Sequence, residues 1–371
     1  MRILVLTNSM SGFRLFRMEL TDRLINNGYN VTLCFPLENE DNPFKNCNII
    51  NIHIDRRGMN PFKDLKLFFK YLSILRKVKP DVVLTYTIKP NLYGGLACVL
   101  QKVPFMPNIT GLGSSFHKRG IVQKLIIAFS KFVFRKAATV FVQNDDILKY
   151  LREINAVSDN VVRIPGSGVN LEKYVLLEYP KEDTPIVFNF VARIMKEKGI
   201  DEYLEAARRI KNNSRFKNVV FNVIGSTEES IYDDILKTEH EKGTICYRGY
   251  QPDMIPYLRG CHCTVNPTYH EGMSNVLQES SACGRPVIAS DIPGCKEIVD
   301  DGVTGFLCKV KDADDLSLKI EKFIMLPYKE KVSMGLLARE KMQREFDRNI
   351  VIDSYMRETK KIQGDENGKP L

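Results

Sequence analysis

Short apolar runs alternate with longer amphipathic stretches along the whole chain. Runs of about four to eight residues rich in Val, Ile, Leu and Phe indicate buried strands, and apolar residues that recur every three or four positions indicate helices. The runs of the first half are RILVLTN, NVTLCF, NIINIHI, VVLTY, FMPNITG and ATVFVQN. Those of the second half are IVFNFVA, VVFNVIG, TICYRG, CTVNPT, PVIAS and GFLCK. Helical spacing occurs between them, over residues 13–26, 63–79, 122–136 and 201–211. This alternation predicts α/β architecture with doubly wound parallel sheets.

The length of the chain predicts two domains, because 371 residues exceed what a single hydrophobic core usually supports. A polar, proline-containing stretch, EYPKEDTP at residues 178–185, separates the two sets of apolar runs and is typical of a linker. We therefore expect one domain over residues 1–178 and a second over residues 179–344, with a final helix near residues 345–361. The polar end of the chain, residues 362–371, is expected to be disordered.

Two acidic residues stand eight positions apart in the segment EGMSNVLQE, directly after the run CTVNPT. The glycine-containing turn followed by a helix-forming stretch places Glu271 in the turn and Glu279 about two helical turns away on one face. The backbone N–H groups of Ser274, Asn275 and Val276 would then lie at the helix N-terminus, where free donors and the helix dipole favour a phosphate. Carboxylates that accept hydrogen bonds from hydroxyls, beside a phosphate cradle, predict a site for a sugar nucleotide.

Further polar residues surround this segment in the second half of the chain. In VARIMKEKGI, Arg193 and Lys198 follow the run IVFNFVA, and ligands of open α/β sheets bind beyond the strand ends. Two cations there could hold a diphosphate, and the alternative is a pair of solvated surface charges. After the run PVIAS, the segment SDIPGCKEIVDDGVTGF supplies Gly294, Gly302 and Gly305 as turn residues.

A strand, a basic turn, the paired glutamates and a glycine-rich turn in this order resemble the C-terminal donor-binding domain of family 4 retaining glycosyltransferases. The resemblance implies the GT-B fold, with two Rossmann-like doubly wound parallel-sheet domains facing across a cleft and the final helix packed back on the first domain. Three further segments resemble the capsule-type branch of the family, namely NPF at 60–62, TGLGSSF at 110–116 and PGSGVN at 165–170. Enzymes of that branch add an N-acetylhexosamine or related hexose from a UDP-sugar to a polyprenyl-diphosphate-linked saccharide.

The same resemblance implies roles for individual residues. Arg193 and Lys198 would neutralise the departing diphosphate, Glu271 would contact hydroxyls of the donor sugar, and Glu279 would contact the ribose. The amides at Ser274, Asn275 and Val276 would bind the donor diphosphate. No metal or cofactor is expected, because the nucleotide sugar is itself the substrate.

The first half departs from the family pattern at two places. Many members carry a Gly-Gly pair after the first strand, whereas this chain reads TNSMSGFRLF and offers only Gly12 for close approach to the donor diphosphate. Some relatives carry a histidine in the loop after the fourth strand, which we identify here with Thr110-Gly111-Leu112-Gly113. Gly111, Gly113 and His117 are the candidate residues of the acceptor side.

Charge is distributed unevenly between the two halves. Residues 1–178 carry 25 Lys and Arg against 14 Asp and Glu, a net charge of +11, whereas residues 179–371 carry 29 against 31. In KDLKLFFKYLSILRKVK, apolar residues follow helical spacing at Leu65, Phe68, Phe69, Leu72 and Leu75, with Lys66, Lys70 and Lys77 on another face. A second stretch, GIVQKLIIAFSKFVFRKAA, repeats this with Lys124, Lys131, Arg135 and Lys136.

These basic helices predict contact with anionic lipid headgroups, and the alternative is a pair of ordinary sheet-covering helices. No nucleic-acid-binding motif accompanies the positive charge, so we expect no nucleic acid partner. The chain shows no run of about eighteen apolar residues and no signal-peptide pattern at its start. We therefore expect a cytoplasmic enzyme that lies peripherally on the inner face of the cytoplasmic membrane.

Several other motifs support weaker interpretations. The D-x-D at Asp312 and Asp314, and the pair Asp145-Asp146, precede helical stretches and are interpreted as N-capping acids. The cluster at 261–263, Cys-His-Cys, lacks a second pair of ligands and is interpreted as structural. Two other functions stay open: a non-hydrolysing nucleotide-sugar epimerase, and a non-catalytic nucleotide-sugar-binding partner at the membrane.

Overall fold

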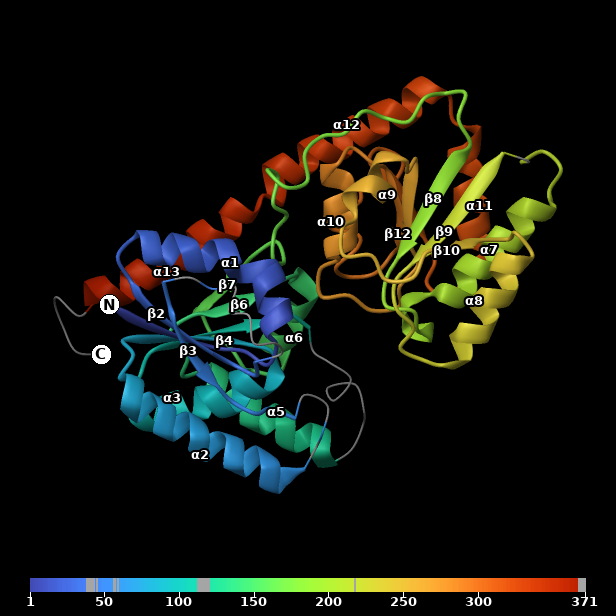
Figure 1. The fold of residues 1–371 in the computed structure, drawn as a ribbon. Coiled ribbons are helices and arrows are strands. Elements are labelled where there is room, and N and C mark those ends of the chain that lie inside the picture. The colour runs from blue at the N-terminus through green and yellow to red at the C-terminus, as the bar shows by residue number, and fades with distance from the viewer. Residues whose placement is uncertain are drawn as a thin grey trace. The chain divides into compact units, whose positions relative to one another are not determined.

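The computed structural model describes residues 1–37, 44, 46–55, 58, 60–111, 121–216 and 218–365. It divides into two compact units, the first formed by Met1–Ser167 with Asn349–Leu371 and the second by Gly168–Arg348. Each unit contains one parallel sheet with helices on both faces (Figure 1).

Seven parallel strands form the sheet of unit 1, in the order β3-β2-β1-β4-β5-β6-β7. They are β1 (Arg2–Leu6), β2 (Asn30–Phe35), β3 (Asn48–Asn51), β4 (Val82–Tyr86), β5 (Phe105–Ile109), β6 (Val140–Val142) and β7 (Val161–Arg163). The helices are α1 (Met10–Asn26), α2 (Pro61–Val78), η1 (Pro90–Gly94), α3 (Gly95–Gln101), α5 (Ile121–Phe134), α6 (Asp145–Glu153) and α13 (Arg348–Asp365). Helices α1 and α13 cover one face of the sheet, and α2, α3 and α5 cover the other (Figure 1).

Six parallel strands form the sheet of unit 2, in the order β10-β9-β8-β11-β12-β13. They are β8 (Ile186–Val191), β9 (Val219–Ile224), β10 (Cys246–Tyr247), β11 (Cys263–Asn266), β12 (Val287–Ser290) and β13 (Gly305–Cys308). The helices are η2 (Lys196–Lys198), α7 (Ile200–Asn212), α8 (Ile231–Glu241), α9 (Ile255–Arg259), α10 (Asn275–Ala282), α11 (Ala313–Met325) and α12 (Tyr328–Glu345). One core lies under α7, α8 and α11, and another lies under α9, α10 and α12.

Each apolar run identified in the sequence forms a strand, and the sequence analysis missed β7. The final helix expected near residues 345–361 is α13, which begins at Arg348, and the separate helix α12 ends before it at Glu345. Helix α13 packs in the α1-side core through Val351, Ile352 and Tyr355. The side-chain amide of Asn108 on β5 donates to the Tyr355 hydroxyl at 2.7 Å.

Unit 2 begins at Gly168, ahead of the boundary expected after residue 178, because side chains of unit 2 bind the intervening backbone. The fully buried guanidinium of Arg285 donates to the carbonyl of Glu178 at 2.6 Å and to that of Leu177 at 3.4 Å. Arg339 donates to the carbonyl of Tyr174 at 2.6 Å. The linker pattern at 178–185 therefore follows a segment that already packs with the second sheet.

The buried face of helix α2 overlaps only partly with the one that the sequence suggested, since Leu75 is buried and Phe68 and Leu72 pack against the core. The side chains of Leu67, Tyr71 and Ile74 are buried, whereas Leu65 is 52% exposed and Phe69 is 59% exposed. The expected apolar stripe through Leu65 and Phe69 is therefore wrong at these two positions. In the part of the chain that the structure describes, every helix is too short or too polar to span a bilayer.

Candidate active site

The strand order of unit 2 changes direction between β8 and β11, which are neighbours in the sheet. Chain connections leave β8 toward β9 on one side and reach β11 on the other, so their carboxyl ends form the crevice where open α/β sheets bind ligands. The loop after β8 carries Arg193 and Lys198, and the loop after β11 carries Glu271 and leads into α10. Most of the residues singled out in the second half of the sequence thus lie at one sheet edge.

Lys198 and Glu271 form an ion pair in this crevice. The Lys198 Nζ donates to Glu271 Oε1 at 2.5 Å, and each side chain is only 19% exposed. The two loops are held together by the backbone, since the Tyr269 N–H donates to the Glu197 carbonyl at 2.9 Å. Gly199 has φ +74°, and a Cβ there would lie 2.1 Å from the Pro267 carbonyl oxygen, so only glycine permits this approach.

Arg193 lies apart from that pair. Its guanidinium pairs with Glu228 at 3.6 Å, on the segment after β9, and more than half of the Arg193 side chain is exposed. The backbone of Ile194 forms a bridge with Thr227 that fixes this neighbour. The two cations that the sequence grouped together therefore have different acidic partners, and Lys198 is the more enclosed of the two.

The glycine-rich turn after β12 closes over the EGMS turn. Gly294 has φ +85°, and a Cβ there would lie 2.7 Å from the Gly272 carbonyl oxygen and 2.8 Å from that of Glu271. The Gly294 carbonyl accepts from the Ser274 N–H at 2.9 Å. The Ser274 amide is therefore engaged, which corrects the prediction that it is one of the free donors.

Helix α10 begins at Asn275, so the amides of Asn275, Val276 and Leu277 belong to its first turn. First-turn amides have no acceptor within their own helix, and the Ser274 side chain does not cap them. The N-terminus of α10 thus presents uncapped donors and the positive end of the helix dipole. A phosphate fits this environment.

Glu279 lies on α10 and contacts the segment at the start of unit 2. Its carboxylate hydrogen-bonds the hydroxyl of Tyr174, and Lys173 and Arg348 lie near it. Burial raises the pKa of the Glu279 carboxyl, while the Tyr174 hydrogen bond and the two cations act in the opposite direction. The structure therefore gives the paired glutamates separate partners, Lys198 for Glu271 and Tyr174 for Glu279, and the sequence did not identify Tyr174.

The candidates of the first half belong to unit 1. Gly12 lies in the first turn of α1, where its N–H donates to Ser9 Oγ at 3.1 Å, so its amide is already part of a helix cap. Gly111 follows β5, and a Cβ there would meet no atom of the described residues within 4 Å. Gly113 and His117 lie outside the described residues. The loop after the fourth strand, β4, starts at Thr87, whereas Thr110 and Gly111 follow β5, which corrects the sequence assignment.

The secondary motifs have structural roles. Asp312 caps α11 by accepting from the Asp315 N–H at 2.9 Å, as interpreted from the sequence. At α6 the cap is Asn144, which accepts from the Ile147 N–H at 2.8 Å, and the acids at 145 and 146 occupy the first turn.

The Cys-His-Cys cluster is buried within unit 2. The His262 Nδ1 accepts from the Val187 N–H at 3.1 Å, and burial beside Lys331 and Arg285 lowers the pKa of His262 to about 4. The described residues contain no group of three or more His, Cys, Asp or Glu that could hold a metal ion. His262 is therefore a neutral hydrogen-bond acceptor near neutral pH.

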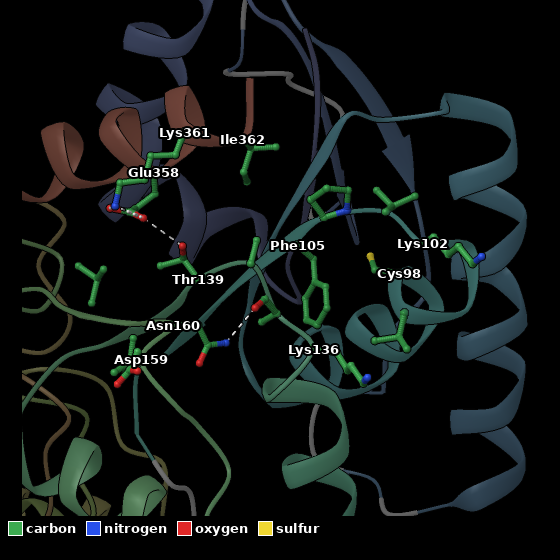
Figure 2. Close-up of a pocket in the computed structure, with 17 residues that line it drawn as sticks. Cys98, Lys102, Phe105, Lys136, Thr139, Asp159, Asn160, Glu358, Lys361 and Ile362 are labelled. Carbon is green, nitrogen blue, oxygen red and sulfur yellow. Dashed lines mark hydrogen bonds and ion pairs between the residues drawn. The ribbon is translucent and has the colours of Figure 1, made fainter. Parts of the chain in front are cut away.

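A cavity of about 730 Å³ in unit 1 lies at the amino ends of β5, β6 and β7 (Figure 2). Phe105, Thr139 and Val161 line it from the strand starts, and Glu358 and Lys361 line it from α13. Thr139 Oγ1 donates to Glu358 at 3.1 Å, and Lys361 Nζ donates to the same carboxylate at 2.9 Å. Since ligands of parallel sheets bind at carboxyl ends, this cavity is separate from the candidate site.

Two family models match the chain, one in each unit. The family model "Glycosyl transferase 4-like" matches residues 2–144, and "Glycosyl transferases group 1" matches residues 178–341. Among solved structures, the chain is similar to sucrose-phosphate synthase from Thermosynechococcus elongatus, with a TM-score of 0.79, 19% identity and coverage of 98% of this chain and 99% of that one. It is also similar to Anabaena HepE in complex with UDP, with a TM-score of 0.76, 15% identity and coverage of 96% and 98%.

Two of the curated relatives are glycosyltransferases named for lipid-linked acceptors. The chain is 27% identical to the N,N'-diacetylbacillosaminyl-diphospho-undecaprenol alpha-1,3-N-acetylgalactosaminyltransferase of Campylobacter jejuni, covering 96% of this chain and 98% of the relative. It is 27% identical to the UDP-Gal:alpha-D-GlcNAc-diphosphoundecaprenol alpha-1,3-galactosyltransferase of Escherichia coli, covering 70% of each. These matches give no support to the epimerase or to the non-catalytic partner. With both units matched and the fold shared, the chain belongs to the GT-B glycosyltransferases, with a glycosyl transferase 4-like first unit and a group 1 second unit.

Proposed function

We propose that this enzyme moves a sugar, an N-acetylhexosamine or related hexose, from a UDP-sugar onto a polyprenyl-diphosphate-linked saccharide, with retention of anomeric configuration. The relatives from C. jejuni and E. coli, named for diphospho-undecaprenol acceptors, support the acceptor class. The observation that carries the donor assignment is the uncapped start of α10 beside the Lys198–Glu271 pair. Surface polysaccharide synthesis is the process that such a transfer serves.

The chemistry follows from the charges at the sheet edge. The bond between the anomeric carbon and the β-phosphate oxygen breaks, and a bond to the acceptor hydroxyl oxygen forms on the same face. The acceptor proton passes to the departing phosphate. Lys198 and the α10 amides oppose the negative charge that builds on the diphosphate, and preorganised groups of this kind contribute strongly to catalysis. Arg193, more exposed, adds to the positive field.

Glu271 and Glu279 divide the recognition of the donor. A diphosphate that attracts Lys198 would release the Glu271 carboxylate from its ion pair, and that carboxylate can then accept hydrogen bonds from sugar hydroxyls. Glu279 accepts from the ribose, with Tyr174 orienting its carboxylate. No metal is needed in this scheme, because protein cations and amides supply the positive charge. Turnover should therefore continue in the presence of EDTA.

The test is a donor-library assay with polyprenyl-diphosphate-linked saccharides and purified enzyme. We expect one UDP-sugar to be transferred, with an α-linked product from an α-linked donor. Glu271→Ala should mainly reduce transfer while nucleotide affinity is kept. Incubation with donor alone tests the epimerase, which would form an epimer. Donor binding without any transfer in the presence of the acceptor would identify a non-catalytic partner.

We further propose that unit 1 lies on an anionic membrane surface through α2. Its outer face carries Phe62, 82% exposed, with Leu65 and Phe69, also exposed, next to the exposed Lys66 and Lys70. Exposed aromatic side chains among lysines suit insertion at a headgroup layer, and each Lys near an anionic surface contributes about 1 kcal/mol. Acceptors anchored in the bilayer would then be within reach at its inner, cytoplasmic face.

Liposome sedimentation tests this location. Wild-type protein should sediment with vesicles that contain anionic lipid at low salt, and replacement of Lys66, Lys70 and Lys77 by Glu should release it. Transfer to a soluble acceptor analogue should be unaffected by that replacement. Failure of the wild-type protein to sediment at low salt would show that α2 only covers the sheet.

A further inference from the structure

Ser274 stands at the N-cap of α10 but does not cap it. In four other helices the N-cap side chain accepts from a first-turn amide, and these residues are Ser9, Asn60, Asn144 and Asp312. Ser274 has the same chemistry and an extended backbone, with φ −75° and ψ 105°, and yet makes no such bond. Serine is among the preferred capping residues, so the missing cap requires a cause.

Asn266, the last residue of β11, contacts the Ser274 hydroxyl instead. Its side-chain Nδ2 donates to Ser274 Oγ at 2.9 Å, and both side chains are buried. The Ser274 N–H is held at the same time by the Gly294 carbonyl. Ser274 is therefore held from two sides, and its hydroxyl oxygen accepts from the strand beneath the helix rather than from a first-turn amide.

The buried polar side chains Asn266 and Gln278, under and on α10, lower the stability of the fold. Among the described residues, the Asn266 Oδ1 and both polar atoms of the Gln278 amide are buried without a hydrogen-bond partner. Gln278 lies one helical turn after Ser274. A buried polar group without a partner costs roughly 1–3 kcal/mol, so an apolar residue at Asn266 would suit a purely structural role better.

We propose that Asn266 is a positioning residue that withholds the Ser274 cap and so reserves the first-turn amides of α10 for the diphosphate of the donor. This inference rests on the proposed function, since it assumes that the donor diphosphate binds at α10. The amides of Asn275, Val276 and Leu277 lose a competing acceptor, and the anion then supplies the missing interaction on binding.

Calorimetry with UDP on the full chain tests the proposal. In Asn266→Ala the freed Ser274 hydroxyl caps α10 and competes with the anion, and UDP affinity should fall about fivefold, the equilibrium equivalent of one cap hydrogen bond. In the double variant Asn266→Ala with Ser274→Ala no hydroxyl remains to compete, and affinity should return toward the wild-type value. Asp312→Ala, which removes the cap of α11, is the matched control and should leave UDP affinity unchanged.

Rescue by the second substitution is the decisive readout, because damage to packing would not be repaired by removing one more polar group. An affinity that stays low in the double variant, or an unchanged affinity in Asn266→Ala, would overturn the proposal. If Asn266→Ala does not fold, Asn266→Ser can replace it in both the single and the double variant. Absence of UDP and pyrophosphate binding by the wild-type enzyme would instead remove the proposed donor site, and this inference with it.

Discussion

Ser9 in unit 1 and Ser274 in unit 2 both stand at the N-cap of a helix with an extended backbone, but their hydroxyls accept from different donors. Ser9 accepts from the Gly12 N–H, so α1 begins with a completed cap. Ser274 accepts from Asn266, so α10 begins with free amides. The difference shows that a helix start near a strand end is not by itself an anion site. What distinguishes α10 is the neighbouring Asn266, which keeps the Ser274 hydroxyl from accepting from the first-turn amides.

The largest effect is expected at the ion pair beside α10. Lys198→Ala should lower turnover by roughly 100- to 1,000-fold, since loss of one transition-state contact costs about 2.7–4 kcal/mol in comparable sites. Arg193→Ala should lower it less, because Arg193 is more exposed and pairs with Glu228. Steady-state rates with a fixed donor measure both. Near-normal turnover in Lys198→Ala would contradict the assignment of the catalytic groups to unit 2.

Loss of the Glu279 carboxylate should weaken binding of free UDP. A hydrogen bond to a charged group contributes about 1.5–3 kcal/mol, so Glu279→Ala should lower affinity by roughly 10- to 100-fold. Calorimetry that finds unchanged affinity would contradict the ribose assignment.

The same carboxyl predicts a pH dependence. Because burial raises its pKa, Glu279 takes up a proton at a higher pH in the folded enzyme than it would when exposed. The folded state therefore gains relative stability as the pH falls through that raised pKa, while the carboxylate needed for the ribose is lost. UDP affinity should decline toward acidic pH, and Glu279→Gln should remove that part of the decline.

Alanine substitutions at two glycines can distinguish the effect of steric contact at the site from the effect of backbone strain. Gly294 and Gly302 both have positive φ, but a Cβ at Gly294 would lie 2.7 Å from a carbonyl oxygen. A Cβ at Gly302 would meet no atom within 4 Å in the part of the chain that the structure describes. Each alanine substitution should cost roughly 1–3 kcal/mol of unfolding free energy from strain. Only Gly294→Ala should also displace the EGMS turn and reduce UDP affinity. Equal effects of the two variants on affinity would contradict a specific role for that contact.

The smallest effect is expected at the completed cap. Ser9→Ala should lower the free energy of unfolding by about 1 kcal/mol, the usual contribution of a cap, as measured by denaturant titration. UDP affinity should not change. A clear loss of affinity in Ser9→Ala would show that the start of α1 also contributes to the donor site.

The fold was predictable because helices cover both faces of each sheet. The strands are therefore buried on both sides and stand out in the sequence as continuous apolar runs. Strand β7 was missed, since VVR is short and only partly buried. The buried face of α2 was misjudged because its apolar residues cover most of the helix surface, and only contact with the sheet selects Leu67, Tyr71 and Ile74. Local spacing alone could not make that choice.

The position of the candidate site was predictable from the sequence, but the hydrogen-bond and ion-pair partners of its residues were not. Glu271, Lys198 and Arg193 follow strands, and a parallel sheet brings such positions to one edge. The Ser274 amide was misassigned because its acceptor, the Gly294 carbonyl, comes from a distant turn. Tyr174 and Asn266 could not be recognised, since their importance depends on contacts with Glu279 and Ser274 that no local pattern encodes.

The buried guanidinium of Arg285 decides where the chain can be cut. A fragment that starts at Tyr179 would leave this cation inside the protein without the carbonyls of Leu177 and Glu178, its two acceptors from the incoming segment. A fragment over residues 168–348 retains both, and also retains Tyr174 for Arg339 and Glu279. The donor unit, expressed by itself, should therefore be obtained folded with the longer start and be recovered poorly with the shorter one.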